Sequence, residues 1–119
     1  MKKHAITGLL VLIFAASGGA KLAALPFEIE AFTRWGYPLW FMYLTGALET
    51  LGALGLLMPV LSRLAASGLA LLMLGAIATH WQHQEWPMLI VATAIGALAA
   101  WRAHLGWREA KVDAARHAD

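Results

Sequence analysis

Residues 39–58 read LWFMYLTGALETLGALGLLM and contain a single charged residue, Glu49. A helix of about 20 apolar residues is long enough to cross a hydrocarbon layer about 30 Å thick. Three further stretches are similarly poor in charge, at residues 5–20, 64–84 and 86–101. We therefore predict an all-α protein, a four-helix transmembrane bundle, with spans at about 5–25, 39–58, 64–80 and 87–103 and a cytoplasmic tail at 104–119.

The composition argues against a water-soluble domain. Of the 119 residues, 61% are hydrophobic and 13% are charged, and the mean hydropathy is +0.64. A soluble domain carries about 25% charged residues to cover its surface. Because the spans account for most of the chain, we predict a single membrane domain over residues 1–119. The chain has no cysteine, which excludes a disulfide, a thiolate metal site and a CxxC redox centre.

The basic residues outside the spans are distributed asymmetrically. If the N-terminus is inside, the cytoplasmic segments hold Lys2, Lys3, Arg63, Arg102, Arg108, Lys111 and Arg116, whereas the outer loops hold Arg34 together with Glu28, Glu30 and Glu85. Cytoplasmic loops of membrane proteins are enriched in Lys and Arg. We therefore predict a multi-pass protein of the plasma (inner) membrane with both termini in the cytoplasm. This distribution explains the pI of 9.3 without nucleic-acid binding.

The N-terminal segment has a second interpretation. Lys2 and Lys3 precede an apolar run at residues 5–16, and small residues follow at 17–20. A cleavable signal peptide has the same order of basic, apolar and small residues. Cleavage after Ala20 leaves three spans and a cytoplasmic C-terminus, so the charge distribution does not separate the two interpretations. The intact mass of the protein separates them.

Three ionisable residues fall at membrane depth: Lys21, Glu49 and His80. A charge at the centre of a bilayer costs about 2.5 to 3.5 kcal/mol on insertion scales, so each residue needs a partner or a cavity. Glu49 lies about 15 Å into its span, near the midplane. Lys21 lies near the outer end of the antiparallel first span, and the two side chains lean toward one another. We predict an ion pair, which serves either as a proton or ligand site or as a structural pair that fixes how the two helices meet.

His80, His83 and Glu85 form an H-x-x-H-x-E pattern at the outer end of the third span. Histidines three residues apart share a helical face, and a carboxylate adds a third potential metal ligand. The surrounding residues instead favour a polar cap at the membrane interface, since they are Trp81, Gln82, Gln84 and Trp86. We therefore predict no bound metal and no cofactor.

The order of several short motifs resembles that of a known family. The first span ends in Gly-Gly-Ala-Lys21-Leu22, Glu49 is followed by LGALGLL at 51–57 with Pro59, Arg63 and Leu64 beyond it, and the third span closes on Ala78-Thr79-His80. Over most of residues 17–100 the chain resembles the DoxX-like small membrane proteins. The resemblance implies an integral membrane bundle with polar positions at Lys21, Glu49 and His80. Some relatives are linked, as membrane subunits, to sulfur or quinone oxidation complexes or to oxidative-stress assemblies.

Two classes of function remain open. The first is a non-enzymatic subunit or assembly factor of a membrane complex, and the resemblance implies a redox link for that complex. Its partners are then the lipid bilayer and either a membrane protein or a second copy of the chain. The alternative is a small transporter or channel that uses Glu49 as a coupling site, by analogy with four-span multidrug exporters. Those exporters carry their membrane Glu in the first span, where this chain has Lys21. A third hypothesis is a redox subunit that binds quinone or haem through His80.

Overall fold

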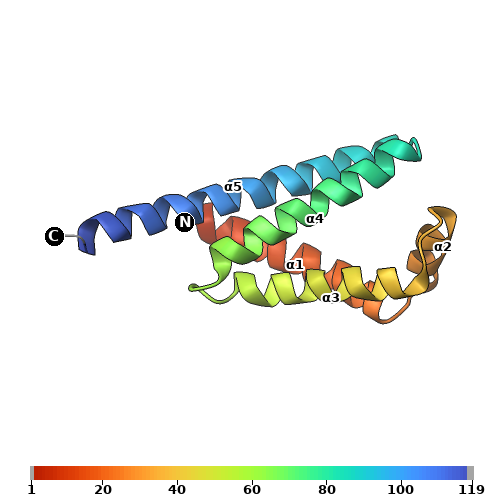
Figure 1. Cartoon of the computed structure of the whole chain (residues 1–119), viewed down its shortest axis with the longest axis horizontal. Coiled ribbons are helices and arrows are strands. Elements are labelled where there is room, and N and C mark those ends of the chain that lie inside the picture. The colour runs from red at the N-terminus through yellow and green to blue at the C-terminus, as the bar shows by residue number, and fades with distance from the viewer. Residues whose placement is uncertain (1, 118–119) are drawn as a thin grey trace.

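The computed structural model describes residues 2–117, and within that range it contains five α-helices and no strand. The helices are α1 (Lys2–Leu22), α2 (Pro26–Arg34), α3 (Leu39–Leu56), α4 (Ser62–Gln82) and α5 (Trp86–His117) (Figure 1). By length and composition α1, α3, α4 and α5 are each able to cross a membrane. The predicted all-α fold with four membrane-spanning helices is therefore confirmed.

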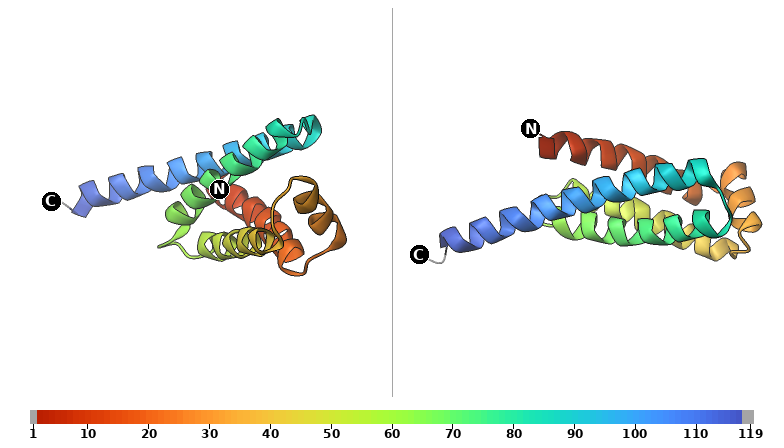
Figure 2. Two further views of the ribbon diagram at one scale, coloured as in Figure 1. Left: turned by 45° about the vertical axis from the view of Figure 1, so that its right-hand side comes forward. Right: turned by 90° about the horizontal axis from the view of Figure 1, so that it is seen from above.

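Successive long helices run in alternating directions along the molecule (Figure 1). α1 packs mainly against α3 and α4 packs mainly against α5, while contacts between α3 and α4 join the two pairs (Figure 2). The buried core contains large side chains from α1, α3 and α4, whereas α5 contributes only alanines. Its members are Leu10, Phe14, Ala53, Leu56, Ala66, Leu69, Met73, Ala92, Ala99 and Ala103.

α1 and α3 approach one another over two glycines, Gly18 and Gly46. A Cβ atom at Gly18 would lie 2.5 Å from Oγ1 of Thr50 and 2.8 Å from the carbonyl oxygen of Gly46. A Cβ atom at Gly46 would lie 2.7 Å from Cβ of Lys21. Helices in lipid gain little hydrophobic energy by meeting, so such close approach supplies much of their packing attraction. It also brings the Lys21 side chain onto the surface of α3.

The first helix ends earlier than the sequence suggests. We expected the first span to reach about residue 25, but α1 ends at Leu22 and Ala24 adopts a left-handed backbone with φ of 52°. Pro26 then occupies the start of α2, where its missing N–H breaks no helical hydrogen bond. α2 was not predicted, and it lies across the end of the bundle opposite the two chain termini (Figure 1).

The last helix is longer than its predicted span. The predicted fourth span at 87–103 lies within α5, which continues without a break from Trp86 to His117. The described part of the predicted tail is therefore helical and extends the α5 axis past the start of α1 (Figures 1 and 2).

Candidate functional site

The contact expected between Lys21 and Glu49 is present in the structure. The ammonium Nζ of Lys21, in the last turn of α1, lies 2.9 Å from Oε1 of Glu49 in the middle of α3. Glu49 is only 5% exposed. Its Oε1 atom makes no hydrogen bond of good angular geometry, so charge attraction holds this contact.

Ser17 connects the same two side chains. It lies one helical turn before Lys21, and its hydroxyl donates a hydrogen bond of 2.8 Å to Oε2 of Glu49. The Lys21 ammonium in turn donates to the Ser17 hydroxyl at 2.8 Å. Both oxygens of the Glu49 carboxylate are therefore contacted by α1, which fixes the depth at which α1 and α3 meet.

Glu28 also contacts Lys21, and this contact was not predicted from the sequence. Glu28 lies in the first turn of α2, is buried, and accepts a hydrogen bond of 3.2 Å from Lys21 through Oε2. We refer to Ser17, Lys21, Glu28 and Glu49 as the Lys21 cluster. The cluster contains two carboxylates and one ammonium, and Lys21 pairs with both acidic side chains.

The structure places His80 with Glu85 rather than with Lys21 or Glu49. Nδ1 of His80 lies 2.8 Å from Oε1 of Glu85, and donates to it when that nitrogen carries the proton. Glu85 also accepts hydrogen bonds from Arg34 at 2.9 Å and from the Trp35 indole at 3.1 Å. We refer to these four residues as the Glu85 cluster. It joins the end of α2 to the turn between α4 and α5.

The Glu85 cluster stabilises the charged form of its carboxyl group. Partial burial of Glu85 raises its pKa, but the hydrogen bonds from His80, Arg34 and Trp35 and the charge of Arg34 outweigh that effect. The net pKa of Glu85 is below its ordinary value. Glu85 is therefore an ionised acceptor at neutral pH.

His83 does not join the other two residues of the H-x-x-H-x-E pattern. Its Nδ1 atom lies 2.8 Å from the carbonyl oxygen of Thr79, and its side chain is exposed. The hydroxyl of Thr79 pairs with that of Tyr37 at 2.8 Å. Within residues 2–117, no group of three His, Cys, Asp or Glu side chains is close enough together to hold a metal ion.

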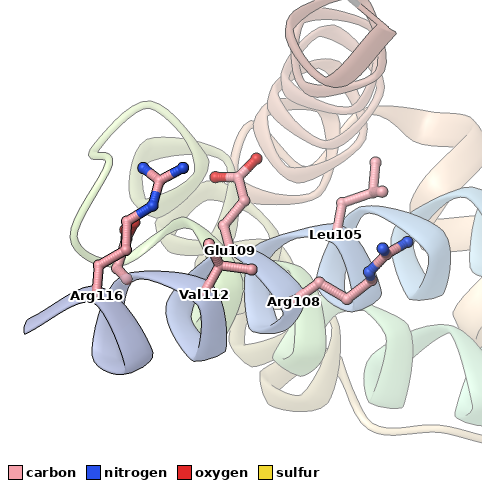
Figure 3. Close-up of a pocket in the computed structure, with 6 residues that line it drawn as sticks. Leu105, Arg108, Glu109, Val112 and Arg116 are labelled. Carbon is pink, nitrogen blue, oxygen red and sulfur yellow. The ribbon is translucent and has the colours of Figure 1, made fainter. Parts of the chain in front are cut away.

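Two hollows lie on the surface, away from the ionisable residues at membrane depth. An apolar groove of about 560 Å³ runs between α3 and α4 past Gly52, Gly55 and Gly68. A hollow of about 360 Å³ lies beside the last turns of α5, and all the residues that line it belong to α5 (Figure 3). Neither hollow includes Lys21, Glu49 or His80.

Comparisons with known proteins agree with a small membrane protein. A family model described as the DoxX-like family matches residues 5–102. An uncharacterized protein of Bacillus subtilis (strain 168), YdgD, is 39% identical over 75 residues, which cover 60% of this chain and 66% of YdgD. The match thus spans just under two thirds of the length of that relative. No solved structure matches the chain.

Proposed function

Because this chain belongs to the DoxX-like family, we propose that it is a plasma-membrane protein that acts as a non-enzymatic subunit or assembly factor of a larger membrane complex. The observation that carries this proposal is the internal pairing of the charges at membrane depth. Glu49 is 5% exposed and contacts Ser17 and Lys21 of its own chain. Ionisable residues inside a membrane face either a packed interior or a water-filled cavity, and the packing around Glu49 favours a structural role.

The groove between α3 and α4 is the surface that we propose for the partner. Gly68 lies on it and would place a Cβ atom in open space, with no other atom within 4 Å. Small residues allow a second helix to approach closely in lipid. A membrane helix of a partner protein can therefore pack there against the backbone of α4.

Crosslinking in native membranes tests this proposal. A photoreactive residue at Gly68 is expected to capture one partner protein in stoichiometric yield, and Gly68→Leu is expected to abolish its co-purification in mild detergent. Gly8 on α1 is a matched control, since a Cβ atom there also meets nothing within 4 Å. The absence of any stoichiometric partner, or equal capture from Gly8 and Gly68, would contradict the proposed role. Capture of a second copy of the chain would identify a homo-oligomer.

A transporter that uses Glu49 as a proton site is the second candidate. The observation that favours it is the presence of two carboxylates, Glu28 and Glu49, around the single ammonium of Lys21. Protein reconstituted in liposomes is then expected to carry a proton flux that Glu49→Gln removes. Glu30→Gln, on the exposed face of α2, is the control. Equal flux in protein-free liposomes excludes this function.

A further inference from the structure

Two arginine side chains meet beside Gly106, at the end of the bundle where α1 and α4 begin (Figure 1). A Cβ atom at Gly106 would lie 2.7 Å from Cβ of Arg63 and 3.1 Å from Nη1 of Arg102. Arg102 is only 4% exposed, and its Nε atom donates to the Thr7 hydroxyl at 2.7 Å. The glycine at position 106 therefore leaves room for the base of the Arg63 side chain and for the guanidinium of Arg102.

Within the described residues, neither arginine forms a direct ion pair with a carboxylate, although the pKa of Glu109 is lowered by its hydrogen bond from Lys3 and also by the charge of Arg102. None of the ion pairs among residues 2–117 includes Arg63 or Arg102. Glu109 lies two turns beyond Arg102 on α5, but it pairs with Lys3 at 2.9 Å. Nε of Arg63 and Nη1 of Arg102 are buried and have no hydrogen-bond partner in the described part of the chain. Burying a charged donor without an acceptor raises the free energy of the folded state. An anion that accepts hydrogen bonds from these atoms would lower it.

The start of α4 adds further positive character at this place. Arg63 is the second residue of α4, and Leu61, which precedes the helix, supplies no side-chain cap for the free amides of the first turn. These amides and the helix dipole favour an anion. The Arg63 guanidinium lies 4.9 Å from the centre of the Trp107 ring, and the indole N–H of Trp107 donates a hydrogen bond to Ser67, one turn further along α4.

We propose that Arg63 and Arg102, with the free amides at the start of α4, bind a phosphate group. The group is supplied by the headgroup of an anionic phospholipid or by free inorganic phosphate. A guanidinium binds phosphate through two parallel N–H donors, which a single-point ammonium does not provide. Basic pockets between membrane helices near the membrane surface are a common place for phospholipid headgroups.

Binding requires one side chain to move. The two unpartnered nitrogens are buried beneath neighbouring atoms in this structure. Arg102 is held by Thr7, whereas Arg63 is half-buried and contacts the exposed Trp107 ring. Arg63 is therefore the movable side chain, and phosphate binding is expected to change the fluorescence of Trp107.

The test uses the full-length protein in nanodiscs of phosphatidylcholine, to which phosphatidylglycerol or inorganic phosphate is added. Native mass spectrometry is expected to detect one retained phosphatidylglycerol per chain. Arg63→Gln and Arg102→Gln are expected to weaken binding about tenfold or more, as for the loss of a charged hydrogen bond. Arg108→Gln removes the same charge from an exposed position on α5 and is expected to leave binding unchanged.

The two sources of phosphate give different results. Retention of phosphatidylglycerol over phosphatidylcholine without an effect of phosphate identifies the lipid headgroup, while a saturable rise in Tm with phosphate alone identifies the free anion. A response to both supports recognition of the phosphate group itself. If Arg102→Gln does not fold, Arg63→Lys keeps the charge, loses the paired donors and is expected to bind more weakly. No saturable binding to wild type, or equal weakening by Arg108→Gln, overturns the proposal.

Discussion

Nδ1 of His80 lies 2.8 Å from the carboxylate of Glu85, across the turn that joins α4 to α5. The same carboxylate accepts hydrogen bonds from Arg34 and Trp35, which follow each other at the end of α2. The Glu85 side chain thus connects the end of α2 to α4 and to the turn before α5. It does so without contributing to the Lys21 cluster, so the two clusters can be tested separately.

The Glu85 cluster predicts a loss of stability in acid. The pKa of Glu85 is lower in the folded protein than its ordinary value, which is about 4.3 in an unfolded chain. Its contribution is therefore fully present above the unfolded pKa and disappears as the pH falls through the folded pKa. Glu85→Gln is expected to lower stability by about 1 kcal/mol above about pH 5, and this difference should shrink as the pH falls through the folded pKa of Glu85. Thermal unfolding in detergent across this pH range measures the difference.

The exposed residue Glu30 is the control for this measurement. Glu30→Gln removes the same charge from α2 and should leave the pH profile of the wild type unchanged. A constant difference between wild type and Glu85→Gln from pH 3 to pH 7 would show that the carboxylate charge is not the cause.

A second prediction is that Lys21 and Glu49 are energetically coupled. Removal of one partner leaves the other buried without compensation, which costs about 3 kcal/mol or more for buried pairs. Lys21→Met and Glu49→Leu should therefore each lower the Tm in detergent strongly, and the double variant should recover part of the loss. The recovery should be incomplete, because Glu28 also loses its hydrogen bond from Lys21. Adding Glu28→Gln to the double variant should increase the recovery of the Tm. Simple addition of the two single effects would mean that the residues act independently.

A third prediction contrasts two neighbouring glycines on α1. Gly18→Ala places a Cβ atom within 2.5 Å of Thr50 and within 2.8 Å of the Gly46 backbone, whereas Gly19→Ala meets nothing within 4 Å. Overpacking of a closely packed contact typically costs about 1 to 3 kcal/mol. Gly18→Ala should accordingly lower the Tm, and Gly19→Ala should leave it unchanged or raise it, since alanine favours helix by about 1 kcal/mol over glycine. Equal Tm values for the two variants would contradict the close approach of α1 and α3.

A fourth prediction concerns the orientation in the membrane. A reporter fused after Asp119 should be cytoplasmic, and one inserted after Gln84 should be external. Gln84 suits the insertion because it is exposed and lies in the turn between α4 and α5. The physical reason is the excess of Lys and Arg on the side of the termini. An external reporter at the C-terminus would overturn the proposed topology. If the charge distribution sets the topology, the double variant Arg63→Glu, Arg108→Glu should reduce the fraction of protein with a cytoplasmic C-terminus.

The long helices could be predicted because each apolar run is long enough to cross a bilayer, which depends on composition alone. α2 could not be found in this way. Its nine residues include two glutamates, and only the buried pair Glu28 and Phe32, one turn apart, marks an amphipathic helix. The end of α1 was placed too late because the apolar character continues to Leu25, whereas the backbone already reverses at Ala24.

The candidate site was predicted in part, for physical reasons that differ between residues. Lys21 and Glu49 follow from their depths on antiparallel helices, and Ser17 could have been added because it lies one turn from Lys21. Glu28 could not, since its contact depends on how the chain reverses after α1. His80 meets Glu85 across a turn, where helical spacing has no predictive value. Arg102 was counted only among the basic residues of the cytoplasmic segments, and its burial results from the packing of α5 against α1 and α4.

The unbroken course of α5 has a mechanical consequence. Its 32 residues form a rod of roughly 48 Å, so a tilt of about 10° at Trp86 displaces the opposite end by roughly 8 Å. No hinge absorbs this displacement along the way. A small movement of the turn at Glu85 is therefore amplified into a large sideways movement of the last helical turns, and any molecule bound there experiences it directly.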